Sequence, residues 1–532
     1  MSDIDSIYIR SRLTSMVLSV AMGALAVGYN TGVVSCGLLF MDQVYEDVTT
    51  ASKIRFVSYA ILAGTIGASG AGIFSNYFGR RFTIIISDLF LIAGPIVMSI
   101  AIGTISLIFG RLIVGVGIGT NMMMGPMFLQ EGSPLGVRSK FQPTYFCAYF
   151  VGLILSYLSG IFFPGKLFPI FAVAVIPAIV QIVLMAFTQN DPPLYLAKRG
   201  ALIQADKFLK LMFSFNGEES NNEYARNRQE LVQAQKSGAQ AEKSILQCAY
   251  QLIANYRWNL FVGCMLHLLQ QFSGFTLVQY YGVQILRDAG FSDASNSLVL
   301  GCMVLVSVVM LVGNIVCIQV SERYGRRQLV LYCTMPMAVA MLGLTFCVAV
   351  NVFSETPGSF KLGGWIGLIA LCVFMAFCSV GFATQPWTLC QEIFPAYLKN
   401  MAITITNLVS WACNYAIASW YLSMTDGQMG KCIMYSIMGI SSLAAFGFCF
   451  RYLPETKDLP LDKAVELVKY AQYVPASGNG NGGVGDDEVE LDEEEYEEMI
   501  SGRKNKGKRQ GAIQMSEQQQ PKRKQFGTGR QG

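Results

Sequence analysis

Long apolar stretches alternate with short polar segments along most of the chain. Each stretch has about the length that a helix needs to cross a hydrocarbon core, which takes roughly 20 mostly apolar residues. The pattern predicts twelve membrane-spanning helices, at residues 13–40, 56–76, 82–103, 105–129, 142–162, 167–187, 258–286, 296–320, 329–351, 364–389, 401–422 and 431–452. We therefore expect an all-α membrane protein with two six-helix bundles.

The two bundles follow from a polar central segment, residues 188–257, which separates six spans from six. We expect a cytosolic N-terminus at 1–12, an N-terminal bundle at 13–187, a C-terminal bundle at 258–452 and a cytosolic tail at 453–532. FGRR at 78–81 recurs as YGRR at 324–327, and QEGSPLGVR at 130–138 recurs as QEIFPAYLK at 391–399. Parallel half-repeats are typical of transporters that bind substrate near the bilayer midplane, between two moving bundles.

Composition and charge agree with this picture. Hydrophobic residues make up 53% of the 532 positions and charged residues 14%, against about a quarter charged in soluble domains. Lysine and arginine gather at the N-terminus, in alternate loops and in the central segment, so the positive-inside rule predicts that both termini are cytosolic. We expect a multi-pass protein of the plasma membrane. The glycine-rich and highly charged tail is predicted to be mostly disordered.

Uncharged hydrogen-bonding side chains interrupt the seventh apolar stretch. Gln270, Gln271 and Thr276 lie in QQFSGFTLVQYY, residues 270–281. Amides both donate and accept, which suits a neutral ligand with many hydroxyl groups, whereas an ion would require charge. The alternative is a set of hydrogen bonds between helices. Because the polar residues are clustered, we favour a substrate cavity.

Aromatic and charged residues extend the candidate site. Trp387, in TQPW, and Trp411, with Asn414 one turn later, lie inside apolar stretches, where an indole offers a flat face and one N–H donor to a sugar ring. Arg111 is a cation deep in the fourth span and needs a partner. The repeated motifs supply two matching charge clusters, which we expect to hold the bundles together on the cytosolic side: Arg80, Arg81, Glu131, Arg138, Arg326, Arg327, Glu392, Lys399 and Glu455.

These motifs resemble those of the sugar porter family of the major facilitator superfamily, over about residues 13–460. The resemblance rests on GYNTGVVS (28–35), FGRR, GRLIVGVGIG (110–119), the pattern from Pro126 to Arg138, QQFSG, SERYGRR (321–327), PW…EIFP (386–395) and PETKDLPLD (454–462). It implies a hexose or polyol site in which Gln270, Gln271, Trp387 and Asn414 contact the sugar and Trp411 lines the pocket.

The resemblance also bears on energy coupling. Proton-coupled members that look like this chain usually carry aspartate where this chain has Asn30, whereas facilitative glucose carriers have asparagine. An amide does not exchange a proton near neutral pH, so we expect facilitated diffusion, with Asn30 and Arg111 at the coupling position. His267, the sole histidine, is expected to tune substrate choice in the pocket rather than carry protons.

Several positions depart from the family pattern. The family residues are replaced by Thr276 after QQFSGF, Phe146 on the fifth span, Met310 on the eighth and Ser410 before Trp411. The first loop motif has Asn76 and Tyr77, and NDPPLYL at 190–196 is a degraded PESPRWL motif. A pocket with fewer hydrogen bonds, each contributing about 1 kcal/mol, implies weak affinity, another polyol or a loss of transport.

Three functions remain open on these grounds: a facilitative hexose carrier, a proton-coupled hexose or myo-inositol symporter, and a non-transporting sugar sensor that signals through its tail. We expect a sugar or polyol and the lipid bilayer as partners, with no nucleic acid and with a monomer sufficient for transport. No cluster of nucleophile, base and oxyanion donor predicts an enzyme. The 14 cysteines show no metal-binding spacing, so no metal or cofactor is expected.

Overall fold

The structure, a computed structural model, describes residues 10–213, 218–240, 245–353, 361–395, 398–456 and 461–470. The chain divides into two units, Met1–Ala471 and Gln472–Gly532, and all described residues belong to the first. The predicted disorder of the tail after residue 470 and the placement of residues 1–9 lie outside the described part of the chain.

The prediction of twelve spans is confirmed: twelve described helices are long and apolar enough to cross a membrane. Six come from the first half of the chain: α2 (Arg10–Val44), α3 (Thr50–Phe78), α4 (Arg80–Ser99), α5 (Thr104–Gly132), α6 (Leu135–Phe162), and α7 (Leu167–Ala172) with α8 (Val175–Thr188) as the sixth. Many extend a turn or more beyond the predicted bounds, because helices continue past the apolar core into polar surroundings.

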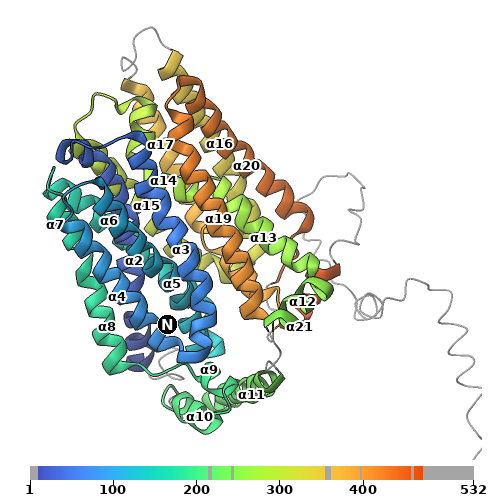
Figure 1. Ribbon diagram of the computed structural model, residues 1–532. Coiled ribbons are helices and arrows are strands. Elements are labelled where there is room, and N and C mark those ends of the chain that lie inside the picture. The colour runs from blue at the N-terminus through green and yellow to red at the C-terminus, as the bar shows by residue number, and fades with distance from the viewer. Residues whose placement is uncertain are drawn as a thin grey trace, which may run out of the picture. The chain divides into compact units, whose positions relative to one another are not determined.

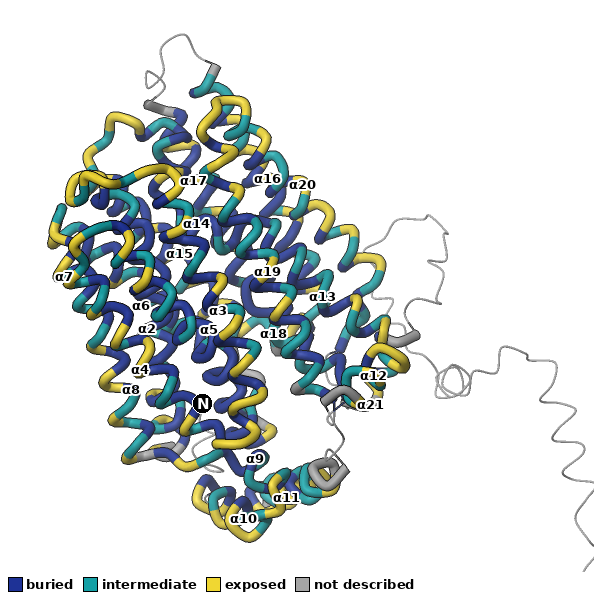
Figure 2. Tube along the Cα trace, in the orientation of Figure 1, coloured by how far each residue is buried: buried dark blue, intermediate teal, exposed yellow. Residues whose placement is uncertain are grey.

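The second half supplies the other six spans. They are α13 (Arg257–Phe272) with α14 (Phe275–Leu286) and η1 (Arg287–Phe291), α15 (Asn296–Tyr324), α16 (Arg326–Phe353), α17 (Lys361–Phe377) with η2 (Cys378–Phe382) and α18 (Gln385–Glu392), α19 (Lys399–Thr425) and α20 (Gln428–Tyr452). In Figure 1 the blue-to-cyan helices of the first half lie beside the green-to-red helices of the second. Buried residues fill the interior between helices, and exposed residues lie mainly on outward faces and at the ends (Figure 2).

The central segment also forms helices, α9 (Pro193–Lys198), α10 (Leu202–Lys210), α11 (Glu218–Gln240) and α12 (Ile245–Asn255). One more helix, α21 (Leu461–Tyr470), lies within the stretch that was predicted to be mostly disordered. Its Ala464, Val465 and Val468 are buried, and the Asn259 Nδ2 atom donates a hydrogen bond to the Val465 carbonyl at 2.9 Å. Three apolar side chains on one face are enough to order this short helix against α13.

Three spans that the apolar pattern predicts as continuous are interrupted, and the sixth is divided at Val173 and Ala174 between α7 and α8. The seventh changes from α13 to α14 at Ser273 and Gly274, and Gly274 adopts a φ of 96°. That left-handed conformation favours glycine, and a Cβ atom there would also lie 2.7 Å from the Met438 sulfur. The tenth span passes through a π-helical turn, η2, before Pro386 starts α18. The break in the tenth span leaves the Phe382 and Ala383 carbonyls to accept hydrogen bonds from a side chain of the seventh span.

The repeated motifs occupy matching places. Backbone N–H groups at the start of α4 and of α16 are capped by carboxylates from distant segments. Asp191 accepts a hydrogen bond from the Arg81 amide at 2.9 Å, and Glu455 accepts from the amides of Arg326 and Arg327 at 2.8 and 3.0 Å. A carboxylate at a helix N-terminus satisfies free donors and opposes the helix dipole. We call the end of the bundles where α4 and α16 begin the charged end.

Candidate substrate site

The helix breaks position Gln270. Its Nε2 atom donates hydrogen bonds to the carbonyls of Phe382 and Ala383, at 2.7 and 2.9 Å. These carbonyls are released where η2 ends, so the Gln270 side chain ties the broken seventh span to the broken tenth. Its Oε1 atom is buried and has no hydrogen-bond partner in the described structure. The Nε2 half of this amide is therefore structural, and the Oε1 half is buried near the His267 imidazole without a well-formed hydrogen bond.

Gln271 is held by two hydroxyl groups. Its Nε2 atom donates to the Ser410 Oγ atom at 2.9 Å, and its Oε1 atom accepts from Thr276 at 2.7 Å. Only 5% of the Gln271 surface is exposed. Ser410 and Thr276 are two departures from the family pattern, and together they supply hydrogen-bond partners for both ends of the Gln271 amide. A ligand has to exchange hydrogen bonds with this triad rather than fill an open position.

Asn414 and Trp411 bring α19 to the site. Asn414 is buried beside the Tyr280 hydroxyl group, and its Oδ1 atom has no hydrogen-bond partner among the described residues. Trp411 is 7% exposed, and its ring lies against Gly64 of α3. The indole therefore packs across the boundary between the two bundles.

His267 and Trp387 form a second aromatic contact within the C-terminal bundle. Their ring centroids are 5.0 Å apart in an edge-to-face arrangement. His267 is 1% exposed with no partner for Nδ1 in the described structure, whereas Trp387 is only partly buried. The structure thus places His267 behind the indole, one helical turn before Gln270.

The remaining predicted pair, Asn30 and Arg111, meets through the backbone. The Arg111 guanidinium donates to the Asn30 carbonyl at 3.1 Å and to the Phe56 carbonyl at 3.4 Å, and lies 4.8 Å from the Phe56 ring centroid. The Asn30 side chain turns away and donates to the Ala26 carbonyl. No carboxylate pairs with Arg111 in the described part of the chain. Carbonyl oxygens and an aromatic face therefore solvate this buried cation.

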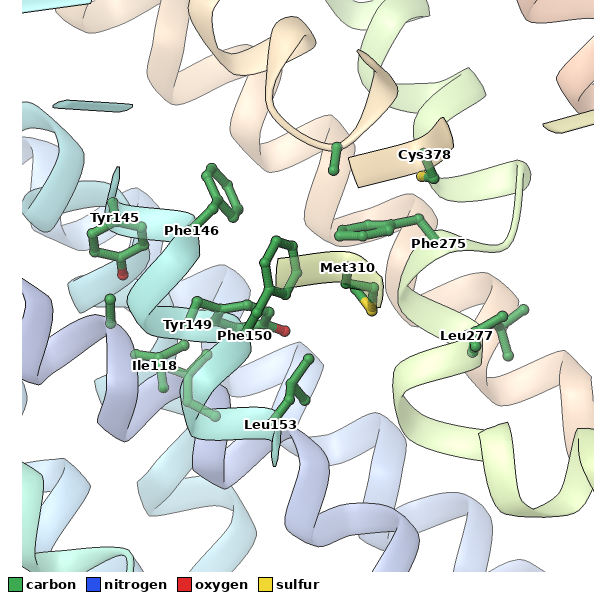
Figure 3. Packing of buried hydrophobic residues seen from close by; sticks show 14 of the residues in the cluster. Ile118, Tyr145, Phe146, Tyr149, Phe150, Leu153, Phe275, Leu277, Met310 and Cys378 are labelled. Atoms are coloured by element: carbon green, nitrogen blue, oxygen red, sulfur yellow. The ribbon is translucent and has the colours of Figure 1, made fainter. Parts of the chain in front are cut away.

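Contacts that the sequence reading missed join the bundles on the side away from the charged end. The Tyr149 hydroxyl group of α6 is hydrogen-bonded to the Gln279 Oε1 atom of α14. Tyr157 donates to the Gln279 carbonyl at 3.1 Å, and Ser35 of α2 donates to the Tyr280 carbonyl at 2.7 Å. Figure 3 shows Tyr149 and Phe150 on the side of α6 toward Met310, whereas Tyr145 lies on the opposite side of that helix. The polar Gln279 within the apolar run was the available signal.

Toward the charged end the bundles also touch. Asn314 of α15 donates from Nδ2 to the Pro143 carbonyl of α6 at 2.6 Å, and the same Nδ2 atom lies 3.1 Å from the Cys147 sulfur. Together with the Trp411 contact on α3, this means that the two halves meet on both sides of the Gln270–Gln271 pair. The two halves are thus in contact on both sides of the site, and we call this conformation closed.

Several buried amide atoms around this junction have no hydrogen-bond partner in the described structure. They come from both halves: Asn30 Oδ1, Gln270 Oε1, Gln279 Nε2, Asn314 Oδ1 and Asn414 Oδ1. A buried polar atom without a partner costs roughly 1–3 kcal/mol, and natural proteins contain few of them. Both acceptors and a donor are present, which is the requirement for binding hydroxyl groups.

The predicted charge clusters form separate networks. In the first half, Glu131 binds Arg80 at 2.9 Å and Lys198 at 3.0 Å, and Arg138 binds Glu230 of α11 at 2.7 Å. In the second half, Arg326 binds Glu392 at 3.2 Å. Arg81 and Arg327 instead donate to backbone carbonyls at the ends of α8 and α20, and Glu455 caps α16.

Lys399 connects these networks electrostatically. It begins α19, but the charges that act on it belong to the first half and the central segment, with Arg138 and Lys198 as the cations. Burial and, next, these two cations lower the pKa of Lys399 to about 8. The charged end therefore brings like charges from the two halves together, with Glu131 and Glu230 partly offsetting them.

Comparison with known proteins agrees with the fold. The family model described as "Sugar (and other) transporter" matches residues 16–467. Curated relatives include probable inositol transporter 2 of Arabidopsis thaliana, 25% identical over 85% of this chain and 91% of the relative, and the arabinose-proton symporter of Escherichia coli K12, 26% identical over 85% and 93%.

Solved structures show the same fold. The proton:xylose symporter XylE bound to 6-bromo-6-deoxy-D-glucose superimposes with a TM-score of 0.72, at 23% identity over 85% of this chain and 98% of that one. The inward open conformation of XylE from E. coli gives a TM-score of 0.64, at 21% identity over 86% and 99%. The chain belongs to the sugar transporter family and has the major facilitator fold.

Proposed function

We propose that this protein moves a neutral hexose or polyol across a membrane by alternating access, through facilitated diffusion. The observation that carries the proposal is the group of unpaired buried amide atoms where the two bundles meet. A hydroxyl-rich solute satisfies such atoms by donating and accepting at once, whereas the described conformation leaves them without partners. A transporter of this family is not an enzyme, and the substrate leaves chemically unchanged.

The roles of individual residues follow from their contacts. Gln271 and Asn414 offer amides to the sugar, Thr276 and Ser410 orient Gln271, and Trp387 and Trp411 offer flat apolar faces. Gln270 fixes the broken helices and presents only Oε1 to the ligand. His267 shapes the pocket from behind Trp387.

Facilitated diffusion is proposed from the coupling position. Asn30 cannot gain or lose a proton, and Arg111 is solvated by carbonyls and the Phe56 ring near the Tyr280 hydroxyl group, so this pair has no carboxylate or imidazole partner among the described residues. The competing mode is proton symport, which the similarity to the arabinose-proton symporter and to the proton:xylose symporter favours. A sensor that binds sugar without moving it is the third possibility.

The charge clusters are proposed to set the balance between conformations. In that reading the charged end faces the cytosol, in the plasma membrane, with both termini on that side. Ion pairs within each half hold the helix ends in place. Lys399 interacts electrostatically with charged groups outside its own half. Opening of this end separates Lys399 from Arg138 and Lys198, so these cations weaken the closed state, while the acids beside them strengthen it.

Uptake of labelled glucose, fructose and myo-inositol into proteoliposomes, with and without a pH gradient, tests the proposal. Gln271→Ala should raise the KM roughly 3- to 10-fold, since it removes one amide worth about 1 kcal/mol. Gln189→Ala is the matched control: Gln189 is similarly buried and donates to Ser15 and Ser19, away from the junction. Concentrative uptake driven by protons would overturn facilitated diffusion, and binding without flux would leave a sensor.

A further inference from the structure

Asp88 is a buried acid within the membrane-spanning part of the first half that none of the proposed roles uses. It lies on α4, and its residue surface is 0% exposed. Its Oδ1 atom accepts a long hydrogen bond, 3.4 Å, from the Asn121 Nδ2 atom, and its Oδ2 atom has no partner in the described structure. A buried ionised carboxylate requires a cation or several donors, and Asp88 has neither.

Asp288, the buried acid of the second half, shows what an ionised carboxylate looks like in this protein. Lys431 lies 2.7 Å from its Oδ1 atom, the Tyr435 hydroxyl group 3.0 Å from Oδ2, and the Gln284 amide donates at 3.3 Å. One cation and two further donors therefore surround Asp288. The contrast with Asp88, which has a single distant amide donor, indicates different protonation states for the two acids.

The surroundings of Asp88 are polar but uncharged. Asn121 of α5 contacts it, Gln181 of α8 accepts a hydrogen bond from the Asn121 Nδ2 atom at 3.1 Å, and Tyr145 of α6, the titratable group in the cluster, contacts Asn121 at 3.4 Å. Helices α7 and α8 carry no titratable residue. Arg80 and Arg111 are engaged elsewhere, and in the described structure none of the remaining titratable side chains of the neighbouring helices contacts Asp88: Tyr29 and Asp42 of α2, Lys53, Arg55, Tyr59 and Tyr77 of α3, and Glu131 of α5.

The geometry favours a proton over a metal cation. The Asn121 Nδ2 atom lies 3.3 Å from Ser87 Oγ, 3.4 Å from Asp88 Oδ1 and 3.1 Å from Gln181 Oε1. An NH₂ group thus occupies the centre of three oxygens, the place that a sodium ion would take. A proton on Oδ2 needs no such space and removes the charge.

We propose that the Asp88 carboxyl group is a proton-binding site of the N-terminal bundle, occupied while both ends of the substrate site are closed. The ligand is a single proton held on Oδ2. Ionisation would draw the Asn121 amide toward the carboxylate and away from Gln181. Asn121 also accepts from Tyr145, which lies one turn before Tyr149, the residue that holds Gln279 of the other bundle. Loss of the proton therefore disturbs the helix that joins the two halves.

This inference rests on the proposed function only for its effect on transport. In facilitated diffusion the proton changes the rate of the cycle and not the final sugar level. Transport should slow as the pH rises, because the neutral acid fits the closed bundle and the ionised acid does not. The substitution Asp88→Asn imitates the neutral acid in size and should keep most of the wild-type rate at neutral pH.

Infrared spectroscopy of the full-length protein in lipid vesicles tests the proton directly, without any sugar. The C=O stretch of a protonated carboxyl group should be present at neutral pH in the wild type and in Asp288→Asn, and absent in Asp88→Asn. Wild-type protein labelled with ¹³C-aspartate should show the band shifted, which tests the assignment even if the variant does not fold. A band that survives Asp88→Asn, or the absence of any band from the wild type, overturns the proposal.

A transport assay distinguishes failure of the Asp88 proton site from failure of the proposed transport mode. Sugar exchange at equal pH on both sides is followed from pH 6 to pH 9 in a Lys399→Met background, because Lys399 titrates in the same range. The rate should fall severalfold with Asp88 and stay level with Asp88→Asn. An equal fall in both contradicts the proposal, as does a rate or an infrared band that depends on sodium. Proton-driven accumulation would overturn facilitated diffusion while leaving the proton site intact.

Discussion

Gly64→Ala is expected to force open the charged end of the transporter. A Cβ atom at Gly64 of α3 would lie 2.5, 2.9 and 3.1 Å from three ring carbons of Trp411 in α19. Ordinary contact between carbons begins further out, at roughly 3.5 Å. The added methyl group thus meets a large, buried ring of the opposite bundle, and the two bundles have to separate or Trp411 has to move.

The free-energy cost of this clash in the closed state can be estimated from the size of the added group. Inserting one methyl group into a packed contact usually destabilises that arrangement by about 1–3 kcal/mol. The clash exists only while α3 and α19 are together, so the whole cost falls on the closed state. An equilibrium between closed and open charged ends should therefore shift by roughly 5- to 150-fold toward the open form.

Cys147 provides the assay. It lies in α6 beside Asn314 of α15, between the bundles on the charged side, and is partly buried. Labelling of Cys147 by a hydrophilic maleimide, read by mass spectrometry, should accelerate in Gly64→Ala. Gly70→Ala is the matched control on the same helix, because a Cβ atom there meets nothing within 4 Å. Unchanged labelling of Cys147 in Gly64→Ala, or equal acceleration in both variants, would show that crowding Trp411 at Gly64 does not open the charged end.

Three further predictions concern positions outside the ligand contacts. Gly274→Ala should cut transport at least about tenfold, since it strains the left-handed φ of 96° and displaces Met438, at a cost of roughly 1–3 kcal/mol; flux measurements check this. Glu455→Gln should lower the unfolding free energy by about 1–2 kcal/mol by weakening the cap on α16, visible as a lower Tm. The pKa of Lys399 is lowered to about 8 in the closed state, so the closed charged end should gain stability as the pH rises from about 8 toward the usual pKa of about 10.4. Over that range Cys147 labelling should slow in the wild type relative to Lys399→Met.

Much of the fold was predictable because each span is long and apolar. The length of a membrane core sets the helix length, and the repeated FGRR and QE motifs relate the halves, so the twelve helices appear near their expected places. The breaks at Gly274 and η2 were not predictable from hydropathy. An apolar scale gives glycine and serine little weight, and the π-helical turn depends on packing between helices.

The candidate site was predictable in kind rather than in contacts. Polar residues in an apolar run indicate either a cavity or helix contacts, and Gln270 makes the helix contacts through Nε2, while its Oε1 atom has no hydrogen-bond partner among the described residues. The Tyr149–Gln279 bond joins residues 130 positions apart, so no local pattern could reveal it. Asp88 was not predicted as a site because a single acid inside the apolar run 82–103 does not show by itself whether its side chain is buried.

Sugar counterflow measures directly whether the buried amides receive a hydroxyl-rich solute between two moving bundles. Proteoliposomes loaded with unlabelled glucose, fructose or myo-inositol are placed in a trace of the same labelled sugar at equal pH. Labelled sugar should accumulate transiently inside the proteoliposomes for at least one of the three sugars. Gln271→Ala should weaken this accumulation when the sugar is limiting, and Gln189→Ala should leave it unchanged. Absence of exchange for every hexose and polyol, with no sugar protection of Cys147 from labelling, would contradict the claim that the buried amides receive a hydroxyl-rich solute between two moving bundles.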